Sequence, residues 1–297
     1  MTTVTPGSGA TMPSVTLQQR RRYESDGLFV APGLLGPKVL GAVHAAIDEL
    51  VAADRAAGSQ VVEFEETPID GERIPRRIFH PFENHAVFRD LAVAPALLDP
   101  VKELLGPNLV LQHSKLNMKA GRVGAPVDWH QDLTYFPHTN TSLVAVLIYL
   151  DDATTDNGCL EVLPGCHHEF LDHSMPDGSF AGMITASIDR APVVVEGAAG
   201  TAVFLHPLTP HRSRANRSPS QRRVLIYQYR AADAFPIYSG SQVAACEQHA
   251  CHLTGEVARY ARFGGPSPAI YVPTNPARSI FELQAQARTM LGSSREE

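Results

Sequence analysis

The expected fold is decided by three consecutive segments: Leu143-Val-Ala-Val-Leu-Ile-Tyr-Leu150, the polar segment Asp151–Gly158, and Cys159-Leu-Glu-Val-Leu163. A continuous apolar run of this length is typical of a strand that is buried on both faces. The polar segment reads as a loop, and Pro164-Gly165 ends the second strand. This stretch therefore predicts two neighbouring strands in a sheet that is covered on both sides.

The same pattern of short apolar runs and turn residues extends over residues 108–230. Further candidate strands are Val110–Met118, the residues around His130, Pro192–Glu196, Thr201–His206 and Arg222–Tyr229. About seven short strands of this kind are typical of a β-sandwich or jelly roll. We therefore expect a mainly β fold.

Helices are expected on either side of this region, where they would flank the sheets. One amphipathic helix is expected over 37–56, since apolar residues recur there every three or four positions. A second helical segment, 86–105, contains Pro95 and Pro100, which would interrupt it and leave two short helices. A final helix is expected near Ser279–Leu291.

The composition limits the classes of partner that are expected. The chain has 297 residues and a net charge of −6, with no dominant basic patch, so nucleic acid is not an expected partner. No apolar stretch reaches the roughly 18 residues needed to span a bilayer. Residues Met1–Thr16 lack the regions of a signal peptide and read as a disordered lead-in to one domain over 17–297. The expected location is the cytoplasm, with the four cysteines as free thiols.

The segment Trp129-His130-Gln131-Asp132 contains an H-x-D triplet. In a strand, residues i and i+2 point to the same face, so His130 and Asp132 would project an imidazole and a carboxylate into one space. A distant histidine would complete the two-histidine, one-carboxylate ligand set of non-haem Fe(II) oxygenases. The triplet alone occurs often by chance and by itself favours a solvated strand edge.

The segment from Pro210 to Tyr227 favours a metal site over a solvated strand edge. His211 follows an apolar strand, and Arg222 opens the next one. A 2-oxoglutarate that chelates iron needs a fixed cation for its far carboxylate, and arginine is always charged and binds carboxylates through two parallel hydrogen bonds. A buried arginine without a partner is costly. Arg222 therefore indicates a bound ligand.

These segments resemble the phytanoyl-CoA dioxygenase family of 2-oxoglutarate oxygenases, including its ectoine-hydroxylase-like branch. The resemblance runs from about Tyr23 to Tyr229. Three motifs carry it: Glu24-Ser-Asp-Gly-Leu-Phe-Val30, the hairpin Asp156–His167, and an H-x-S-x-x-N-x-S pattern from His211 to Ser218. The resemblance implies a double-stranded β-helix, the jelly-roll fold of cupin-like proteins, with flanking helices.

The resemblance also implies the residues of the site. It places Fe(II) on His130, Asp132 and His211, and the C5 carboxylate of 2-oxoglutarate on Arg222. Ser213 is expected as a second contact to that carboxylate, and Asn117 as a further contact to 2-oxoglutarate. Four more side chains are candidates for substrate contacts, each with a core or solvated position as the alternative: Lys115, Trp129, Tyr135 and His138.

Two positions have rivals. His206 lies on the strand before His211 and is an alternative third ligand, but only His211 fits the family pattern. Arg223 competes with Arg222, because strand alternation lets only one of them point inward. We favour His211 and Arg222. Halogenating relatives lack the carboxylate ligand, so Asp132 favours hydroxylation or another oxidation.

The sequence therefore predicts a dioxygenase that uses Fe(II), 2-oxoglutarate and O2 to oxidise an unactivated C–H bond of a small polar metabolite or natural-product intermediate. An acyl-CoA 2-hydroxylase of the same family is one alternative. A cupin-type metal-dependent isomerase or non-catalytic binding protein is another alternative, although neither needs an arginine at the position of Arg222. The irregular segment after residue 231 is expected to act as a lid, with Arg262 and Phe263 at the mouth of the site. The substrate and the oligomeric state do not follow from the sequence.

Overall fold

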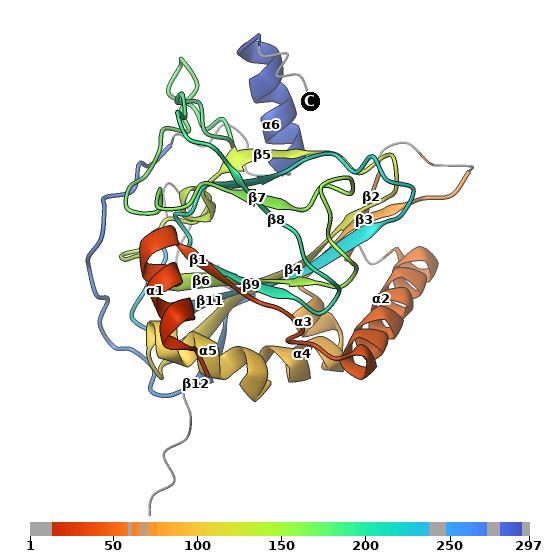
Figure 1. The fold of residues 1–297 in the computed structure, drawn as a ribbon, viewed down its shortest axis with the longest axis horizontal. Coiled ribbons are helices and arrows are strands. Elements are labelled where there is room, and N and C mark those ends of the chain that lie inside the picture. Colours follow the sequence, from red (N-terminus) through yellow and green to blue (C-terminus); the bar gives the residue numbers. More distant parts are fainter. Residues whose placement is uncertain are drawn as a thin grey trace, which may run out of the picture.

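The protein is described here by a computed structural model that covers residues 14–58, 61–65, 68, 71–237, 248–271 and 280–292. Two β-sheets face each other, and helices cover the outer face of the larger one (Figure 1). Within the described residues the larger sheet has eight strands and the smaller sheet four. The expected mainly β fold with flanking helices is confirmed.

The larger sheet is antiparallel throughout and has the order β1-β9-β6-β11-β4-β3-β2, with β12 added to one end of β4. Its strands are β1 (Leu28–Ala31), β2 (Val62–Phe64), β3 (Pro75–Phe79), β4 (Leu109–Lys119), β6 (Leu143–Tyr149), β9 (Ala202–Leu205), β11 (Arg222–Ala231) and β12 (Cys251–Thr254). The central strand β11 pairs with β6 on one side and β4 on the other, so these three strands form the centre of the larger sheet.

Strand β6 explains why its sequence is apolar without a break. Val146 and Ile148 pack on the helices outside the sheet, whereas Leu147 and Tyr149 pack on the smaller sheet. Because successive side chains point to opposite faces, a strand that is covered on both sides needs apolar residues at every position. All seven residues of β6 are buried, as expected.

The smaller sheet has the order β5-β10-β7-β8. Its strands are β5 (Val127–His130), β7 (Leu160–Val162), β8 (Val193–Val195) and β10 (His211–Ser213). The register of β5 and β10 places His211 directly opposite His130. Two histidines that are far apart in the sequence therefore meet on neighbouring strands.

In the described part of the chain, all α-helices except the last lie before β4. They are α1 (Leu17–Asp26), α2 (Pro37–Ala57), α3 (Pro81–Asn84), α4 (Ala86–Ala92) and α5 (Pro95–Leu105), and α6 (Ile280–Met290) follows later. Pro95 begins α5, as expected for a residue whose missing N–H costs nothing in the first turn. Pro100, however, lies inside α5 and does not interrupt it. Its ring is buried beside Leu97 and Val101, and this burial offsets the lost hydrogen bond.

The two ends of the described chain both pack on the sheets. Val15 is buried, and the N–H of Ser14 donates to the Glu103 carboxylate at 2.5 Å, so residues 14–16 belong to the folded part. The rest of the expected lead-in lies outside the described residues. At the other end α6 lies on β5 (Figure 1). In the described part of the chain, no helix is long and apolar enough to cross a membrane.

Candidate metal and co-substrate site

His130, Asp132 and His211 converge between the two sheets, and all three are buried. Oδ1 of Asp132 lies 3.8 Å from Nε2 of His130 and 3.9 Å from Nε2 of His211. The expectation that His130 and Asp132 share a strand is wrong, since β5 ends at His130 and Asp132 begins the 3-10 helix η1 (Asp132–Thr134). Gln131 stays extended, with φ −116° and ψ 128°, so the carboxylate still reaches the histidines.

Backbone carbonyls fix the tautomers of both histidines. Nδ1 of His130 lies 2.8 Å from the Asp128 carbonyl, and Nδ1 of His211 lies 2.9 Å from the Thr209 carbonyl. A carbonyl only accepts, so each ring donates its Nδ1–H and leaves the lone pair of Nε2 for a metal. This outer hydrogen bond is the usual device that orients a ligating histidine.

The electrostatics of the three side chains suit a divalent cation. Burial, followed by the neighbouring His211, holds the pKa of His130 well below its usual range. Burial alone would raise the pKa of Asp132, but His211, Lys115 and His130 outweigh it and hold that pKa below its usual value. His130 therefore presents a neutral imidazole and Asp132 an ionised carboxylate, which are the forms that bind metals.

Gln131 holds this group in place from outside the cleft and is fully buried. Its side-chain nitrogen donates to the carbonyls of Glu169 and Leu208 at 2.8 and 2.7 Å, and its side-chain oxygen accepts from the Leu171 N–H at 2.8 Å. Its backbone N–H donates to Nε2 of His173 at 3.2 Å. No role was assigned to Gln131 from sequence, because a glutamine between two ligand candidates gives no sign of its own burial.

The three residues lie in a cleft with about 850 Å³ of empty volume. Apolar residues of the strands form part of the wall, and Ile280 and Phe281 of α6 complete it. The charged residues that line the cleft, apart from Asp132, are Glu65, Arg76, Arg77, Lys115, Lys119, Arg212 and Arg222. Cations therefore outnumber carboxylates around the candidate metal site.

Arg222 points into the cleft and Arg223 points away from it. The Arg222 side chain is buried, and its Nε has no hydrogen-bond partner among the described residues. Arg223 instead binds both oxygens of Asp151, at 2.9 and 2.7 Å. Burial lowers the pKa of Arg222, but a guanidinium stays charged in proteins. A buried cation with an unsatisfied donor fits the carboxylate of a co-substrate.

Ser213 and Asn117 line the same cleft, as does Lys119, which had no role assigned from sequence. Lys119 lies opposite Arg222 in the register of β4 and β11, and its Nζ donates to the Ser213 carbonyl at 3.1 Å. Burial, followed by the nearby Arg222, holds the pKa of Lys119 well below its usual range. Oδ1 of Asn117 accepts from Nε of Arg77 at 3.0 Å.

The four candidate substrate residues divide into two groups. Lys115 lines the cleft, whereas Trp129, Tyr135 and His138 do not. The guanidinium of Arg212 lies over the Trp129 ring at 4.8 Å. Tyr135 donates its hydroxyl to the Gly182 carbonyl, and His138 is buried with its Nε2 3.2 Å from the side-chain oxygen of Gln112. None of these three side chains lines the cleft, and each has a partner within the protein.

Neither His206, the alternative third ligand, nor the expected lid residues Arg262 and Phe263 lie at the cleft. The His206 ring contacts Tyr23 and His167, with ring centroids 6.0 and 5.0 Å apart, and lies outside the candidate metal group. Arg262 pairs with Asp233 at 2.9 Å, and Phe263 is 78% exposed, so neither residue covers the cleft. The C-terminal contribution to the cleft comes from α6 instead.

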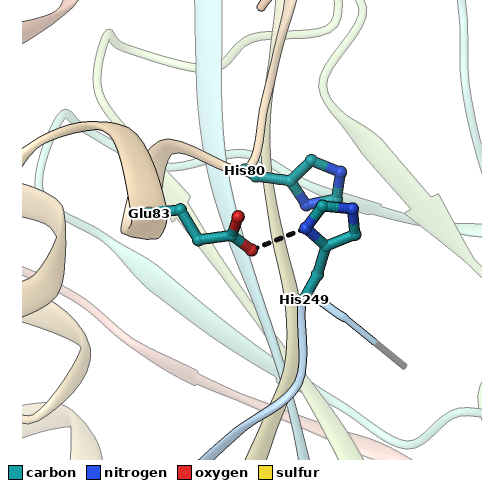
Figure 2. A group of neighbouring side chains, drawn as sticks. All are labelled: His80, Glu83 and His249. Carbon is teal, nitrogen blue, oxygen red and sulfur yellow. Dashed lines mark hydrogen bonds and ion pairs between the residues drawn. The ribbon is translucent and has the colours of Figure 1, made fainter. Parts of the chain in front are cut away.

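A second group of potential ligands lies outside the cleft and consists of His80, Glu83 and His249 (Figure 2). Nδ1 of His249 lies 2.7 Å from a Glu83 oxygen, and the His249 ring stacks on that of His80 with centroids 3.4 Å apart and planes 12° apart. The lone pairs of two nearly parallel rings do not converge on one point, so we assign no metal here. The contacts instead attach the residues before β12 to α3.

Comparison with known proteins identifies the family. Residues 23–224 match the family model of phytanoyl-CoA dioxygenase. A probable alpha-ketoglutarate-dependent hypophosphite dioxygenase of Stutzerimonas stutzeri is 34% identical over 197 residues, which are 64% of this chain and 68% of the relative. A 2-aminoethylphosphonate dioxygenase of an uncultured bacterium is 26% identical over 219 residues, 73% of this chain and 82% of the relative. The crystal structure of EctD from S. alaskensis with bound Fe has a TM-score of 0.68 at 19% identity, with 88% of this chain and 91% of that chain covered.

The fold is the double-stranded β-helix, and the protein is a non-haem iron dioxygenase that depends on Fe(II), 2-oxoglutarate and O2 and acts on a small molecule. The chain belongs to the phytanoyl-CoA dioxygenase family. The expected fold, enzyme class and cofactors are thereby confirmed, and the alternative of a cupin-type isomerase or non-catalytic binding protein finds no support.

Proposed function

We propose that His130, Asp132 and His211 hold the iron and that 2-oxoglutarate binds in the same cleft with its C5 carboxylate on Arg222. One observation carries this assignment: a buried guanidinium with an unsatisfied Nε lines the same cleft as three converging metal-type ligands. A carboxylate would satisfy that donor and offset the cost of burying the cation. Ser213 is a second contact to the carboxylate, and Asn117 a further contact to 2-oxoglutarate.

The bound iron, with 2-oxoglutarate and O2, supplies the oxidising power for breaking an unactivated C–H bond. The chain itself contributes orientation. The carbonyls of Asp128 and Thr209 keep each Nε2 directed at the metal position, and Arg222 keeps the co-substrate in one orientation along the cleft. Apolar residues of the two sheets line part of the cleft and limit the access of water to it, which would protect the reaction from side products.

We propose a polar small molecule as the substrate. The charged wall of the cleft, with Glu65, Arg76, Arg77 and Lys115, suits a polar metabolite better than a fatty acyl chain. The relatives named for hypophosphite and 2-aminoethylphosphonate support the same choice. An acyl-CoA 2-hydroxylase is the less favoured alternative.

We further propose that residues 17–297 form one catalytic domain that works in the cytoplasm without a nucleic-acid or membrane partner. The net charge of −6 supports the absence of a nucleic-acid partner. The free cysteines Cys159, Cys166 and Cys251 are consistent with a reducing compartment.

The test is an anaerobic titration of the Fe(II)-loaded protein with 2-oxoglutarate, followed by the visible metal-to-ligand charge-transfer band. We expect the band in the wild type, and a roughly 10- to 100-fold weaker affinity for 2-oxoglutarate in Arg222→Gln, since hydrogen bonds to a charged group are lost. Arg223→Gln is the matched control on the other face of the strand and should bind 2-oxoglutarate as the wild type does. A wild type that binds iron without giving the band, or equal affinities in Arg222→Gln and the wild type, would contradict the assignment.

A further inference from the structure

Lys115 is a cation without a partner of its own inside the cleft. It lies on β4, where Lys115, Asn117 and Lys119 face the cleft in alternation. Within the described part of the chain, its amino group makes no hydrogen bond and no ion pair, and its side chain is half-buried in the wall of the cleft. Burial lowers the pKa of Lys115, and the nearby Asp132 raises it. An ammonium group in this position is costly unless a ligand pairs with it.

Apart from Arg222, which is assigned to 2-oxoglutarate above, the other cations of the cleft wall lie near carboxylates of the protein or carbonyl oxygens. Arg212 binds Glu161 at 2.7 Å. Arg76 and Arg77 lie 3.9 and 3.7 Å from oxygens of Glu63. Lys119 donates to the Ser213 carbonyl. Lys115 differs from all of these, because the one carboxylate that acts on it in the described part of the chain is Asp132, with which it forms no ion pair.

The bound co-substrate would not neutralise Lys115 either. The two charges of Fe(II) are balanced by Asp132 and by the carboxylate of 2-oxoglutarate that chelates the metal. The second carboxylate of 2-oxoglutarate is balanced by Arg222. Of the cations that line the cleft, Lys119 and Lys115 are then left without a carboxylate of their own among the described residues. Lys119 donates to the Ser213 carbonyl, so Lys115 is the cation that a further ligand would pair with.

A second unsatisfied donor lies on the neighbouring strand. Ile226 of β11 is opposite Lys115 and lines the cleft, and Gln228 lies two residues further along. Because side chains alternate along a strand, Gln228 faces the same side as Ile226. Gln228 is buried, and its Nε2 has no hydrogen-bond partner among the described residues. Gln228 does not line the cleft, however, so Lys115 is the donor of this pair that an anionic group in the cleft would reach.

We propose that the substrate is a small acid and that its carboxylate or phosphonate group binds to Lys115. The acidic group would lie over β4, while the rest of the molecule extends toward His130, Asp132 and His211. This proposal rests on the proposed function, because it takes the iron and 2-oxoglutarate to be bound as described above.

The experiment measures binding without turnover. Protein loaded with Zn(II) in place of Fe(II) and saturated with 2-oxoglutarate is titrated by ligand-observed NMR with matched probes. The probes are cyclohexanecarboxylate and cyclohexanecarboxamide, pentanoate and pentanamide, and butylphosphonate and its diethyl ester. The variants are Lys115→Met, which removes the charge, Lys115→Arg, which keeps it, and the exposed Lys38→Met as the matched control. The two kinds of acid distinguish a carboxylate from a phosphonate as the preferred group.

In the wild type and in Lys38→Met we expect the acid of at least one pair to bind about tenfold or more tightly than its uncharged counterpart. Lys115→Arg should keep this preference, and Lys115→Met should lose it while it still binds 2-oxoglutarate. The proposal is overturned if no acid is preferred, if no acid binds at millimolar concentration, or if Lys115→Met keeps the preference. Failure of the wild type to bind 2-oxoglutarate would overturn the proposed function as well, which separates the two failures.

Discussion

Gln131 lies between two of the proposed iron ligands and does not line the cleft. Its side chain and backbone N–H bind four groups from the segments around Leu171 and Leu208, so the positions of His130 and Asp132 depend on both segments. We therefore regard Gln131 as a positioning residue. Polar groups that orient the ligands of a metal site commonly have a strong effect on the affinity for the metal.

Gln131→Leu should weaken metal binding without removing a ligand. The substitution leaves the buried Leu208 carbonyl without a partner, at a cost of about 1–3 kcal/mol, removes the bonds to the Glu169 carbonyl and the Leu171 N–H, and frees the backbone between the ligands. We expect the affinity for Co(II), measured by competition with a chelator, to fall roughly 10- to 100-fold. The exposed Gln18→Leu is the matched control and should bind Co(II) like the wild type. An unchanged affinity in Gln131→Leu would remove Gln131 from this role.

The sequence was informative about residues that have a recognisable pattern. It grouped His130, Asp132 and His211 and preferred Arg222 to Arg223, and the structure brings these side chains to one cleft. It could not place Trp129, Tyr135 or His138, because nearness along the chain does not determine which side a side chain faces. Lys119 and Gln228 were missed for a related reason: a polar residue in a strand shows its burial only when the facing sheet is known.

Among the elements, the strands with continuous apolar runs were predicted and several others were not. β3, with the sequence Pro75-Arg-Arg-Ile-Phe79, has no apolar alternation, because Arg76 and Arg77 both line the cleft and lie near Glu63. β10 has only three residues and is defined by its partners β5 and β7. Such strands form because the neighbouring strands offer hydrogen bonds, and a local pattern does not record that.

Helix α6 depends on one buried glutamine for its place beside the cleft. The side-chain nitrogen of Gln284 donates to the Gly182 carbonyl at 2.7 Å, and its oxygen accepts from the Asp128 N–H at 2.9 Å. Phe281, one turn earlier, packs its ring 3.5 Å from the guanidinium carbon of Arg76. Loss of the Gln284 contacts would therefore loosen one wall of the cleft.

Gln284→Ala should increase local opening of α6. Loss of two buried hydrogen bonds at about 1 kcal/mol each predicts hydrogen exchange about 10- to 30-fold faster in the helix, with little change in the central strands. Mass spectrometry of deuterated peptides measures both regions. Gln286→Ala, an exposed position on the same helix, serves as the matched control. Equal exchange in Gln284→Ala and Gln286→Ala would show that Gln284 does not hold α6 in place.

In the molecule as a whole, four histidines outside the proposed metal ligands are held neutral by burial. Burial lowers the pKa of His113 and His206 to about 3, and that of His138 and His173 to about 4. In the unfolded chain each would titrate near 6.5. Between these values the unfolded state binds more protons than the folded state, so stability falls as the pH falls below about 6.5.

The metal-free protein should therefore lose stability steeply under mildly acidic conditions. Each of the four histidines contributes up to about 1.4 kcal/mol of unfolding free energy per pH unit below 6.5. Urea unfolding in the presence of a chelator at pH 7.5, 6.5 and 5.5 measures the effect, and His138→Asn should give a shallower dependence. A free energy of unfolding that stays constant from pH 7.5 to 5.5 would show that these histidines are not held neutral.

The wall that α6 adds to the cleft comes from a part of the chain that lies beyond the region matched by the family model, which ends at residue 224. The three proposed iron ligands and Arg222 all lie within that region. The oxidising machinery and this wall thus lie in separate parts of the chain. Substitutions in α6 can therefore present a different surface to incoming molecules while every proposed metal and co-substrate residue is retained.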